Sequence, residues 1–153
     1  MQWLLIMEKA LREKLRNGKF SEVPATRSKT MSAIKGKGNK TTEIKFRFAL
    51  VRAGISGWMM NQTDILGKPD FYFPKNKLAV FIDGCFWHGC PKCGHIPKTN
   101  TEYWREKITR NKKRDNSTTR KLRYRNFKVL RFWEHELKND LPGCVRKLVN
   151  IIK

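Results

Sequence analysis

Residues 68–95 read KPDFYFPKNKLAVFIDGCFWHGCPKCGH, and this stretch decides how the rest of the chain is arranged. Two short apolar runs, 71–73 and 78–82, are typical of strands because aromatic and aliphatic residues follow one another there. The intervening residues 74–76, Pro-Lys-Asn, are typical of a turn. The stretch therefore predicts a β-hairpin.

This hairpin brings together side chains that can do chemistry. Its turn places Asp70 opposite about Val80, and so near Ile82 at the end of the second strand. Cys85 and His88 follow directly after that strand. A carboxylate, a backbone carbonyl and an imidazole are therefore expected at one end of a sheet.

The composition points to a basic globular protein. The chain has 153 residues, of which 34 are Lys or Arg and 13 are Asp or Glu, for a net charge of +21. This length suits one domain with a modest core, and the charge indicates a polyanionic partner, with nucleic acid as the leading candidate. Because 39% of the residues are hydrophobic and five are Trp, a disordered basic tail is excluded.

The apolar segments are too short for a membrane protein. No run approaches the roughly 20 residues that span a bilayer, and the apolar residues 3–7 lead into Glu8-Lys9 without the order of a signal peptide. We therefore expect an intracellular protein, in which clustered cysteines favour a metal over disulfides.

Outside the hairpin, patterning predicts helices and strands in alternation. The expected elements are a helix at 3–17, a helix at 42–54, a strand at 57–61, a helix at 102–125, a strand at 127–133 and a final helix from 141. We expect residues 1–24 to form an N-terminal extension and residues 25–153 the main domain, with 25–42 as an arm. The order indicates an α/β fold.

The helix at 42–54 raises two expectations. Ile44, Phe48 and Val51 are predicted to form its buried stripe. Glu43 lies in the first turn, where a carboxylate suits the helix dipole, so a structural role is the simpler interpretation of this acid.

Three cysteines have the spacing of metal ligands. Cys85, Cys90 and Cys93 supply three thiols. The two strands that flank the helix at 102–125 are expected to run in parallel, so residues just past their ends lie at the same edge of the sheet. His135 can therefore complete a Cys3His zinc site of the structural kind, although His95 is an alternative fourth ligand.

Other residues allow both a structural and a functional interpretation. His88 lies within the metal loop but is not needed as a ligand, so it is available for acid–base chemistry. Phe86 and Trp87 form either a small core under the metal or a wedge for a base stack. Met31 and Ile34 belong either to a linker or to an arm that lies on DNA.

The helix at 102–125 is strongly positive. Residues 101–125 contain ten Lys or Arg and three acids, which favours contact with phosphates over an ordinary solvated face. Asp115 is an isolated acid that can simply pair with neighbouring cations, and Cys144 has the surroundings of a core thiol.

Five stretches in order carry a resemblance to a known family. They are ATRSKTMSAI (25–34), GKPDF (67–71), VFIDGCFWHGC (80–90), TEYWREKITRNKKRD (101–115) and KVLRFWEHEL (128–137). On these motifs the chain from about residue 25 to 137 resembles the very short patch repair (Vsr) DNA mismatch endonucleases.

The resemblance implies a restriction-endonuclease-like mixed sheet flanked by helices, with a structural zinc. It also implies a Mg²⁺-dependent nick on the 5′ side of the thymine in a T:G mismatch, which arises when 5-methylcytosine deaminates. A zinc-stabilised DNA-binding module without cleavage, or a nickase for another lesion, is the alternative. A basic RNA-binding or ribosome-associated protein with a structural zinc is a third interpretation.

The resemblance also assigns roles to residues. Asp70 and the carbonyl of Ile82 resemble the magnesium ligands, His88 the catalytic histidine, Asp115 the acid that orients it, and Glu43 the acid that reaches metal-bound water; Phe86, Trp87 and Met31 resemble the intercalating residues, with Ile34 beside them. The implied partner is double-stranded DNA with a T:G mismatch, and repair proteins are possible further partners. The implied protein is a monomer that works in the cytoplasm of a prokaryotic cell, at the nucleoid.

Overall fold

The computed structural model describes residues 15–16, 19–20 and 42–153. The chain divides into two compact units, residues 1–39 and 40–153, and each is described by itself. In the first unit, β1 (Leu15–Arg16) pairs antiparallel with β2 (Lys19–Phe20). The helix expected at 3–17 is therefore wrong at residues 15–16, where the backbone pairs as a strand.

The remaining expectations for the N-terminal part lie outside the described residues. They concern the rest of the helix at 3–17 and residues 25–41 of the arm, including Met31 and Ile34.

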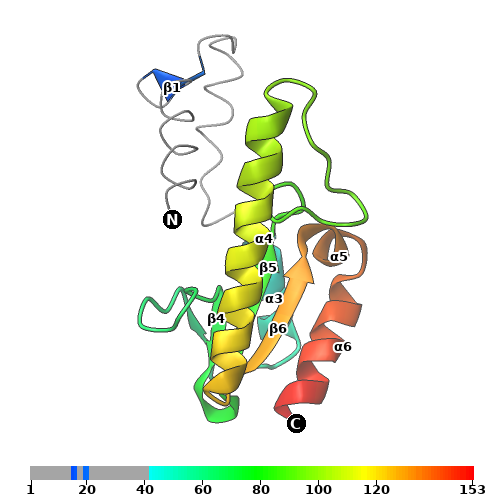
Figure 1. Ribbon diagram of the computed structural model, residues 1–153. Coiled ribbons are helices and arrows are strands. Elements are labelled where there is room, and N and C mark those ends of the chain that lie inside the picture. Colours follow the sequence, from blue (N-terminus) through cyan, green and yellow to red (C-terminus); the bar gives the residue numbers. More distant parts are fainter. Residues whose placement is uncertain (1–14, 17–18, 21–41) are drawn as a thin grey trace. The chain divides into compact units, whose positions relative to one another are not determined.

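The second unit is a mixed sheet flanked by helices (Figure 1). Its elements are α3 (Glu43–Arg52), β3 (Met59–Met60), β4 (Phe71–Phe73), a 3-10 turn η1 (Pro74–Asn76), β5 (Leu78–Asp83), α4 (Thr101–Tyr124), β6 (Lys128–Trp133), α5 (Glu134–Asn139) and α6 (Leu141–Ile152). The strand order is β3-β4-β5-β6, with antiparallel pairs except for parallel β5 and β6. The predicted α/β class, the hairpin and the β5-α4-β6 crossover are confirmed.

The hairpin turn has the geometry that its sequence indicates. Pro74 begins the 3-10 turn, and Lys77 ends it in the left-handed region at φ 46°. The register pairs Phe71 with Val80, so Asp70 lies one residue beyond the last pair, at the end of β5 as expected. The strand expected at 57–61 is shorter, because only Met59–Met60 pair with β4.

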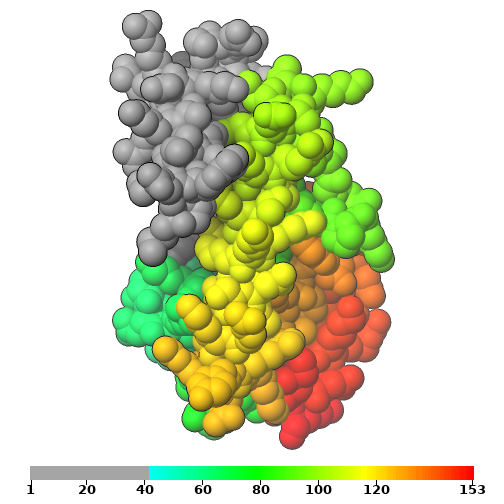
Figure 2. Space-filling view, in the orientation of Figure 1, coloured from blue at the N-terminus to red at the C-terminus, as the bar shows by residue number. Residues whose placement is uncertain are grey.

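The two faces of the sheet carry different helices. Since successive side chains of a strand point to opposite faces, Leu78 and Val80 contact the core under α3 and α6, whereas Ala79 and Phe81 pack with Leu122 of α4. Figure 2 shows α4 running over the middle of its face of this unit. The polar residue that follows in this alternation, Asp83, therefore faces α4.

The buried side of α3 differs from the expected one. Ile44 is 39% exposed, and Phe48 and Val51 are each 58% exposed, so the predicted stripe is wrong. Phe46 and Leu50 are fully buried instead. The helix has two apolar stripes of equal helical spacing, and its packing against the sheet selects one of them.

Aromatic contacts explain this selection. The Phe46 ring lies 5.3 Å from that of Phe71 on β4 and 5.4 Å from that of Phe132 on β6, as measured between ring centroids. Ring pairs at such separations add to the stabilisation from burial alone. One side chain of α3 thus joins both halves of the sheet.

The C-terminal part mostly follows the sequence. Helix α6 begins at Leu141 as expected, and Cys144 is a buried core thiol, 2% exposed, whose pKa is raised by burial. The short helix α5 was not expected, and it follows β6 without a connecting loop. Among the described residues, no helix is long and apolar enough to cross a membrane.

Replacing Phe46 with Ala should destabilise the fold by about 3–5 kcal/mol, because it empties a fully buried aromatic site. The matched variant Phe48→Ala should change stability by less than about 1 kcal/mol, because its ring is mostly in solvent. Urea unfolding followed by circular dichroism measures both. Equal losses in the two variants would contradict the assignment of the buried stripe.

Candidate active site and metal centre

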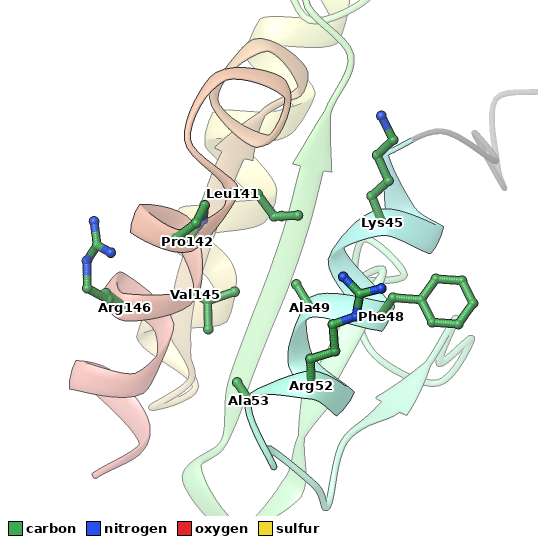
Figure 3. A pocket seen from close by; sticks show the side chains of 9 residues that line it. All are labelled: Lys45, Phe48, Ala49, Arg52, Ala53, Leu141, Pro142, Val145 and Arg146. Atoms are coloured by element: carbon green, nitrogen blue, oxygen red, sulfur yellow. The ribbon is translucent and has the colours of Figure 1, made fainter.

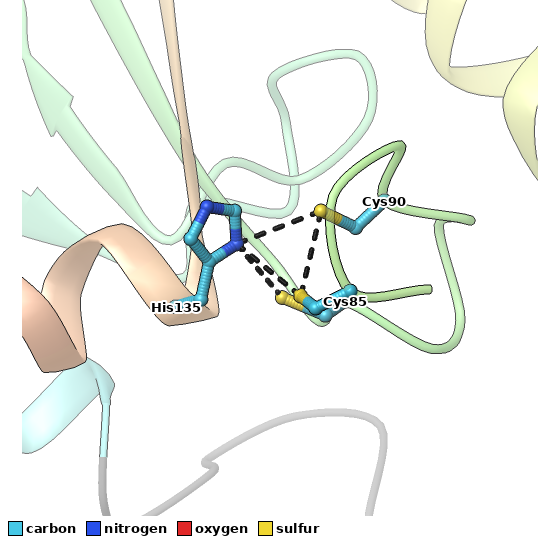
Figure 4. A group of neighbouring side chains, drawn as sticks. Cys85, Cys90 and His135 are labelled. Carbon is cyan, nitrogen blue, oxygen red and sulfur yellow. Dashed lines mark hydrogen bonds between the residues drawn. The ribbon is translucent and has the colours of Figure 1, made fainter. Parts of the chain in front are cut away.

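The three metal-type cysteines and His135 meet at the end of β5 and β6. Cys85, Cys90 and Cys93 lie in the loop after β5, and His135 is the second residue of α5, directly after β6. Their four candidate donor atoms all lie within 4.8 Å of one another (Figure 4). The parallel pairing of the two strands produces this meeting, as the sequence predicted.

The distances fit a tetrahedral ion better than a set of hydrogen bonds. His135 Nδ1 lies 3.3 Å from Cys85 Sγ and 3.5 Å from both Cys90 Sγ and Cys93 Sγ, and the last two sulfurs are 3.6 Å apart. Ligands about 2.0–2.3 Å from zinc in a tetrahedron stand roughly 3.3–3.8 Å apart. A closed Cys3His set of this size suits structural zinc.

His95, the alternative fourth ligand, does not belong to this group. Its ring packs against Phe86 with centroids 5.6 Å apart. Topology, rather than proximity along the chain, therefore selects His135.

The protonation of the thiols shows why a cation suits this site. Burial raises the pKa of Cys85 to about 12, and the nearby Cys93 thiol adds to this effect. For Cys90, burial acts in the same direction, but hydrogen bonds from the backbone of Cys93 and Lys92 outweigh it and lower the pKa. A bound divalent cation would allow all three sulfurs to be thiolates together.

Replacing Cys90 with Ser should abolish stoichiometric zinc and lower the thermal midpoint by several degrees, because a structural metal contributes directly to folding. Cys144→Ser is the control, since that thiol is buried in the core between α6 and the sheet. Zinc content by atomic absorption and melting by circular dichroism measure the effect. If the Cys144→Ser variant lost its zinc and the Cys90→Ser variant kept it, the proposed zinc site would be wrong.

His88 and Asp115 form the tightest polar contact near this loop. His88 Nδ1 lies 2.5 Å from Asp115 Oδ2, which joins the metal loop to the middle of α4. The imidazole therefore donates through Nδ1 and directs Nε2 elsewhere, an arrangement that suits a general base held by a carboxylate. The two side chains are 23% and 16% exposed.

A second carboxylate also approaches His88 Nδ1. Asp83 Oδ1 is 3.5 Å from His88 Nδ1, and Arg131 of β6 binds both oxygens of Asp83 at 2.6 Å. Arg131 also lies 3.6 Å from Asp115 Oδ1 and 3.3 Å from Thr119 Oγ1. The four charged or titratable side chains of Asp83, His88, Asp115 and Arg131 form one network on the α4 side of the sheet.

The network keeps Asp115 ionised. Burial by itself would raise the pKa of Asp115, but the hydrogen bond and charge of His88, together with the charges of Arg131 and Arg114, lower the pKa below the usual value for an aspartate. A carboxylate whose pKa is lower in the folded than in the unfolded state stabilises the fold above its unfolded pKa. That contribution disappears as the pH falls through the folded value.

Asp115→Asn should therefore reduce the loss of stability that the parent protein shows as the pH falls. Above about pH 5 the variant should be less stable than the parent, and the difference should shrink as the pH falls through the lowered pKa of the parent carboxyl, which is then protonated and loses its charge interactions. Urea midpoints at a series of pH values test this. A difference that grows as the pH falls would contradict the sign.

Asp70 contacts the end of β5 through its side chain. Its Oδ2 accepts a 2.7 Å hydrogen bond from the backbone N–H of Ile82, and its backbone carbonyl accepts one from Asn61. The carboxylate thus prolongs the β4–β5 pairing beyond the last strand residue. Since N–H and C=O of one strand residue point to the same side, the Ile82 carbonyl also faces β4.

Glu43 lies on the opposite face of the sheet from α4. It is 8% exposed in the first turn of α3, one turn before Phe46, whose ring contacts Phe71 next to Asp70. The acid is therefore buried on the side of the sheet where Phe46 and Phe71 pack.

Phe86 and Trp87 form part of an aromatic cluster with α4. Each ring lies within 6 Å of the Trp104 ring, with centroids at 5.1 Å and 5.8 Å. Asn111 of α4 also donates a hydrogen bond to the backbone carbonyl of Trp87 at 2.8 Å. Both rings are partly buried among these contacts, and the pair still reaches the surface, so the core and the wedge interpretations both remain compatible with the structure.

Comparison with known proteins identifies the family. The family model described as DNA mismatch endonuclease Vsr matches residues 21–93. DNA mismatch endonuclease Vsr of Escherichia coli (strain K12) is 35% identical over 117 residues, which cover 74% of this chain and 72% of that protein. The chain belongs to the Vsr family. It is accordingly a DNA endonuclease, and its fold is that of the restriction-endonuclease-like class.

Other Vsr-like relatives are named as nicking enzymes. Type II nicking enzyme V.NmeAIP of Neisseria meningitidis is 45% identical over 129 residues, which cover 83% of this chain and 89% of the relative. Type II nicking enzyme V.NaeI of Lentzea aerocolonigenes is 41% identical over 125 residues, which cover 79% and 75%.

Sequence reasoning did not single out two charged members of the His88 network, Asp83 and Arg131. Arg131 lies within a run, FKVLRFW, that indicates only a strand. A charge in the middle of an otherwise apolar strand is the signal that could have marked it, because such a group needs a buried partner. The contact of Trp104 with the Phe86-Trp87 pair also became visible only in the fold.

A hollow of about 590 Å³ lies between α3 and α6, away from the His88 network (Figure 3). Its floor is apolar, with Ala49, Leu141 and Val145 facing one another. Its location on the sheet face opposite α4 separates it from the His88 network. The hollow is therefore separate from the residues that the sequence proposes for chemistry.

Proposed function

We propose that the protein nicks one DNA strand on the 5′ side of the thymine in a T:G mismatch produced by deamination of 5-methylcytosine, and so starts very short patch repair. The observation that supports this most is the arrangement at the end of β5. There the Asp70 carboxylate accepts a hydrogen bond from Ile82, and His88, which follows the Phe86-Trp87 pair, contacts Asp115 of α4.

Asp70 and Ile82 fit a catalytic magnesium. The ion prefers oxygen ligands, and the Asp70 carboxylate with the Ile82 carbonyl would supply two from one strand end. When bound there, Mg²⁺ would neutralise charge on the scissile phosphate. Glu43, buried in the first turn of α3, is the acid proposed to reach metal-bound water.

His88 is the proposed general base. Because Nδ1 is held by Asp115, Nε2 is the nitrogen that would take a proton from the attacking water. The water oxygen then bonds to phosphorus, and the bond from phosphorus to the leaving oxygen breaks. Asp115 would hold the imidazole in one orientation and stabilise the imidazolium that forms.

Phe86 and Trp87 are the proposed wedge. They emerge from a loop fixed by the proposed structural zinc and by the Asn111 hydrogen bond, so their backbone is held while the rings are partly exposed. Insertion of apolar side chains between base steps is easiest at a mismatch, where stacking is already weakened. Met31 and Ile34, outside the described residues, remain predicted DNA contacts.

The net charge of +21 supports DNA as the partner. We propose that the protein acts as a monomer, because one chain contains all the candidate residues. The cationic face of α4 would contact phosphates. We place the protein in the cytoplasm, at the nucleoid, with possible repair proteins as further partners.

The alternative is a nickase with a different mismatch preference. The relatives named as type II nicking enzymes favour nicking as the shared activity. A panel of mismatches in several sequence contexts distinguishes the two, because T:G selectivity predicts cleavage of T:G above all others.

Asp70→Asn should lower nicking by at least about 100-fold while leaving DNA binding intact, because it removes a charge that would hold the metal. Exposed Asp64 provides the control Asp64→Asn, with little expected effect. Single-turnover cleavage of labelled T:G and T:A duplexes, with and without Mg²⁺, measures the rates at fixed salt.

Two results would contradict the proposal. One is equal cleavage of the T:G and T:A duplexes by the parent protein at salt concentrations that suppress non-specific binding. The other is parental nicking by the Asp70→Asn variant.

A further inference from the structure

Arg131 is a charged residue that the proposed cleavage chemistry does not use. It lies in the middle of β6, where its backbone is in register with Phe81 of β5, and its guanidinium lies 4.7 Å from the Phe81 ring centroid. The side chain is 23% exposed, and it points to the α4 side of the sheet. Burying a guanidinium is costly unless its donors are satisfied, so its partners are informative.

Those partners surround His88. Nε and one terminal nitrogen of Arg131 donate to the two oxygens of Asp83 at 2.6 Å, and the other terminal nitrogen donates to Thr119 at 3.3 Å. This two-pronged arrangement occupies Asp83 fully and fixes its orientation. Asp115 lies 3.6 Å from the same guanidinium.

His88 Nδ1 has two carboxylates within reach. Asp115 Oδ2 is at 2.5 Å and Asp83 Oδ1 is at 3.5 Å, although Asp83 is the more buried of the two. One N–H can make only one strong hydrogen bond. A buried carboxylate without a cation would therefore compete strongly for it.

We propose that Arg131 is a positioning residue that binds both oxygens of Asp83 and thereby leaves Asp115 as the partner of His88 Nδ1. Without Arg131, the imidazole would turn toward Asp83, and Nε2 would move with it. The inference rests on the proposed role of His88 in cleavage, but the choice of partner can be measured without cleavage.

Three proteins test the idea: the parent, Arg131→Met, and Arg131→Met with Asp83→Asn. Methionine keeps much of the arginine volume, and asparagine keeps the shape of aspartate without its charge. Arg131→Met should slow single-turnover nicking about 10-fold or more at saturating protein, with unchanged DNA binding. The double variant should recover to within about 3-fold of the parent, because the competing charge is gone.

Nitrogen-15 NMR of the histidine rings provides the readout independent of activity. The Nδ1–H signal of His88 should move in Arg131→Met and return toward the parental position in the double variant. Arg114→Met is the control, since Arg114 also approaches Asp115, at 3.5 Å, but is 63% exposed. It should leave the His88 signal in place.

Arg131→Lys covers the case in which Arg131→Met does not fold. A lysine keeps the positive charge but can satisfy only one oxygen of Asp83 well, so the His88 signal should move and nicking should slow, both less than in the methionine variant. Folding of each variant is checked by circular dichroism at the assay temperature.

The outcomes separate the possibilities. A parental His88 signal in folded Arg131→Met or Arg131→Lys would overturn the proposal, and so would a double variant whose signal does not return. If the parent protein cleaves no mismatched DNA, the proposed function fails, but the NMR comparison still decides which carboxylate holds His88.

Discussion

The parallel pairing of β5 with β6 is the constraint on which the rest of the molecule depends. It runs in register from Leu78 beside Lys128 to Asp83 beside Trp133, and both strands end at the same edge. The loop after β5 and the helix after β6 therefore begin next to each other. A metal set drawn from residues 85–93 and 135, far apart in sequence, follows from this pairing.

Because side chains alternate along the two strands, the two faces of the sheet carry different residues and pack against different helices. One face packs on α3 and α6 through a wholly apolar core cluster. The other begins apolar under the C-terminal half of α4 and becomes polar toward the strand ends, where Asp83 and Arg131 pair. Buried charges are tolerated there because each has a partner of opposite sign within hydrogen-bonding distance.

Helix α4 and the cysteine loop depend on each other at that polar end. The loop contributes His88 and the two aromatic rings, and α4 contributes Asp115, Trp104 and Asn111. The cysteines of the same loop meet His135 of α5 in the candidate metal site. The candidate base is thus held by a helix, a strand and a metal loop at once, which suits chemistry that needs a fixed geometry.

The sequence by itself determined the hairpin, the crossover, the cysteine spacing and the candidates Asp70 and His88, because each depends on local patterning or on the general behaviour of parallel strands. Only the tertiary structure distinguished between alternatives that the local sequence pattern supports equally well. It chose Phe46 over Phe48 on α3, since two apolar stripes have the same spacing and only contact with the sheet separates them. It also revealed the role of Arg131. A strand pattern predicts which face of the sheet a charged side chain points to, but it does not predict which residues that side chain contacts.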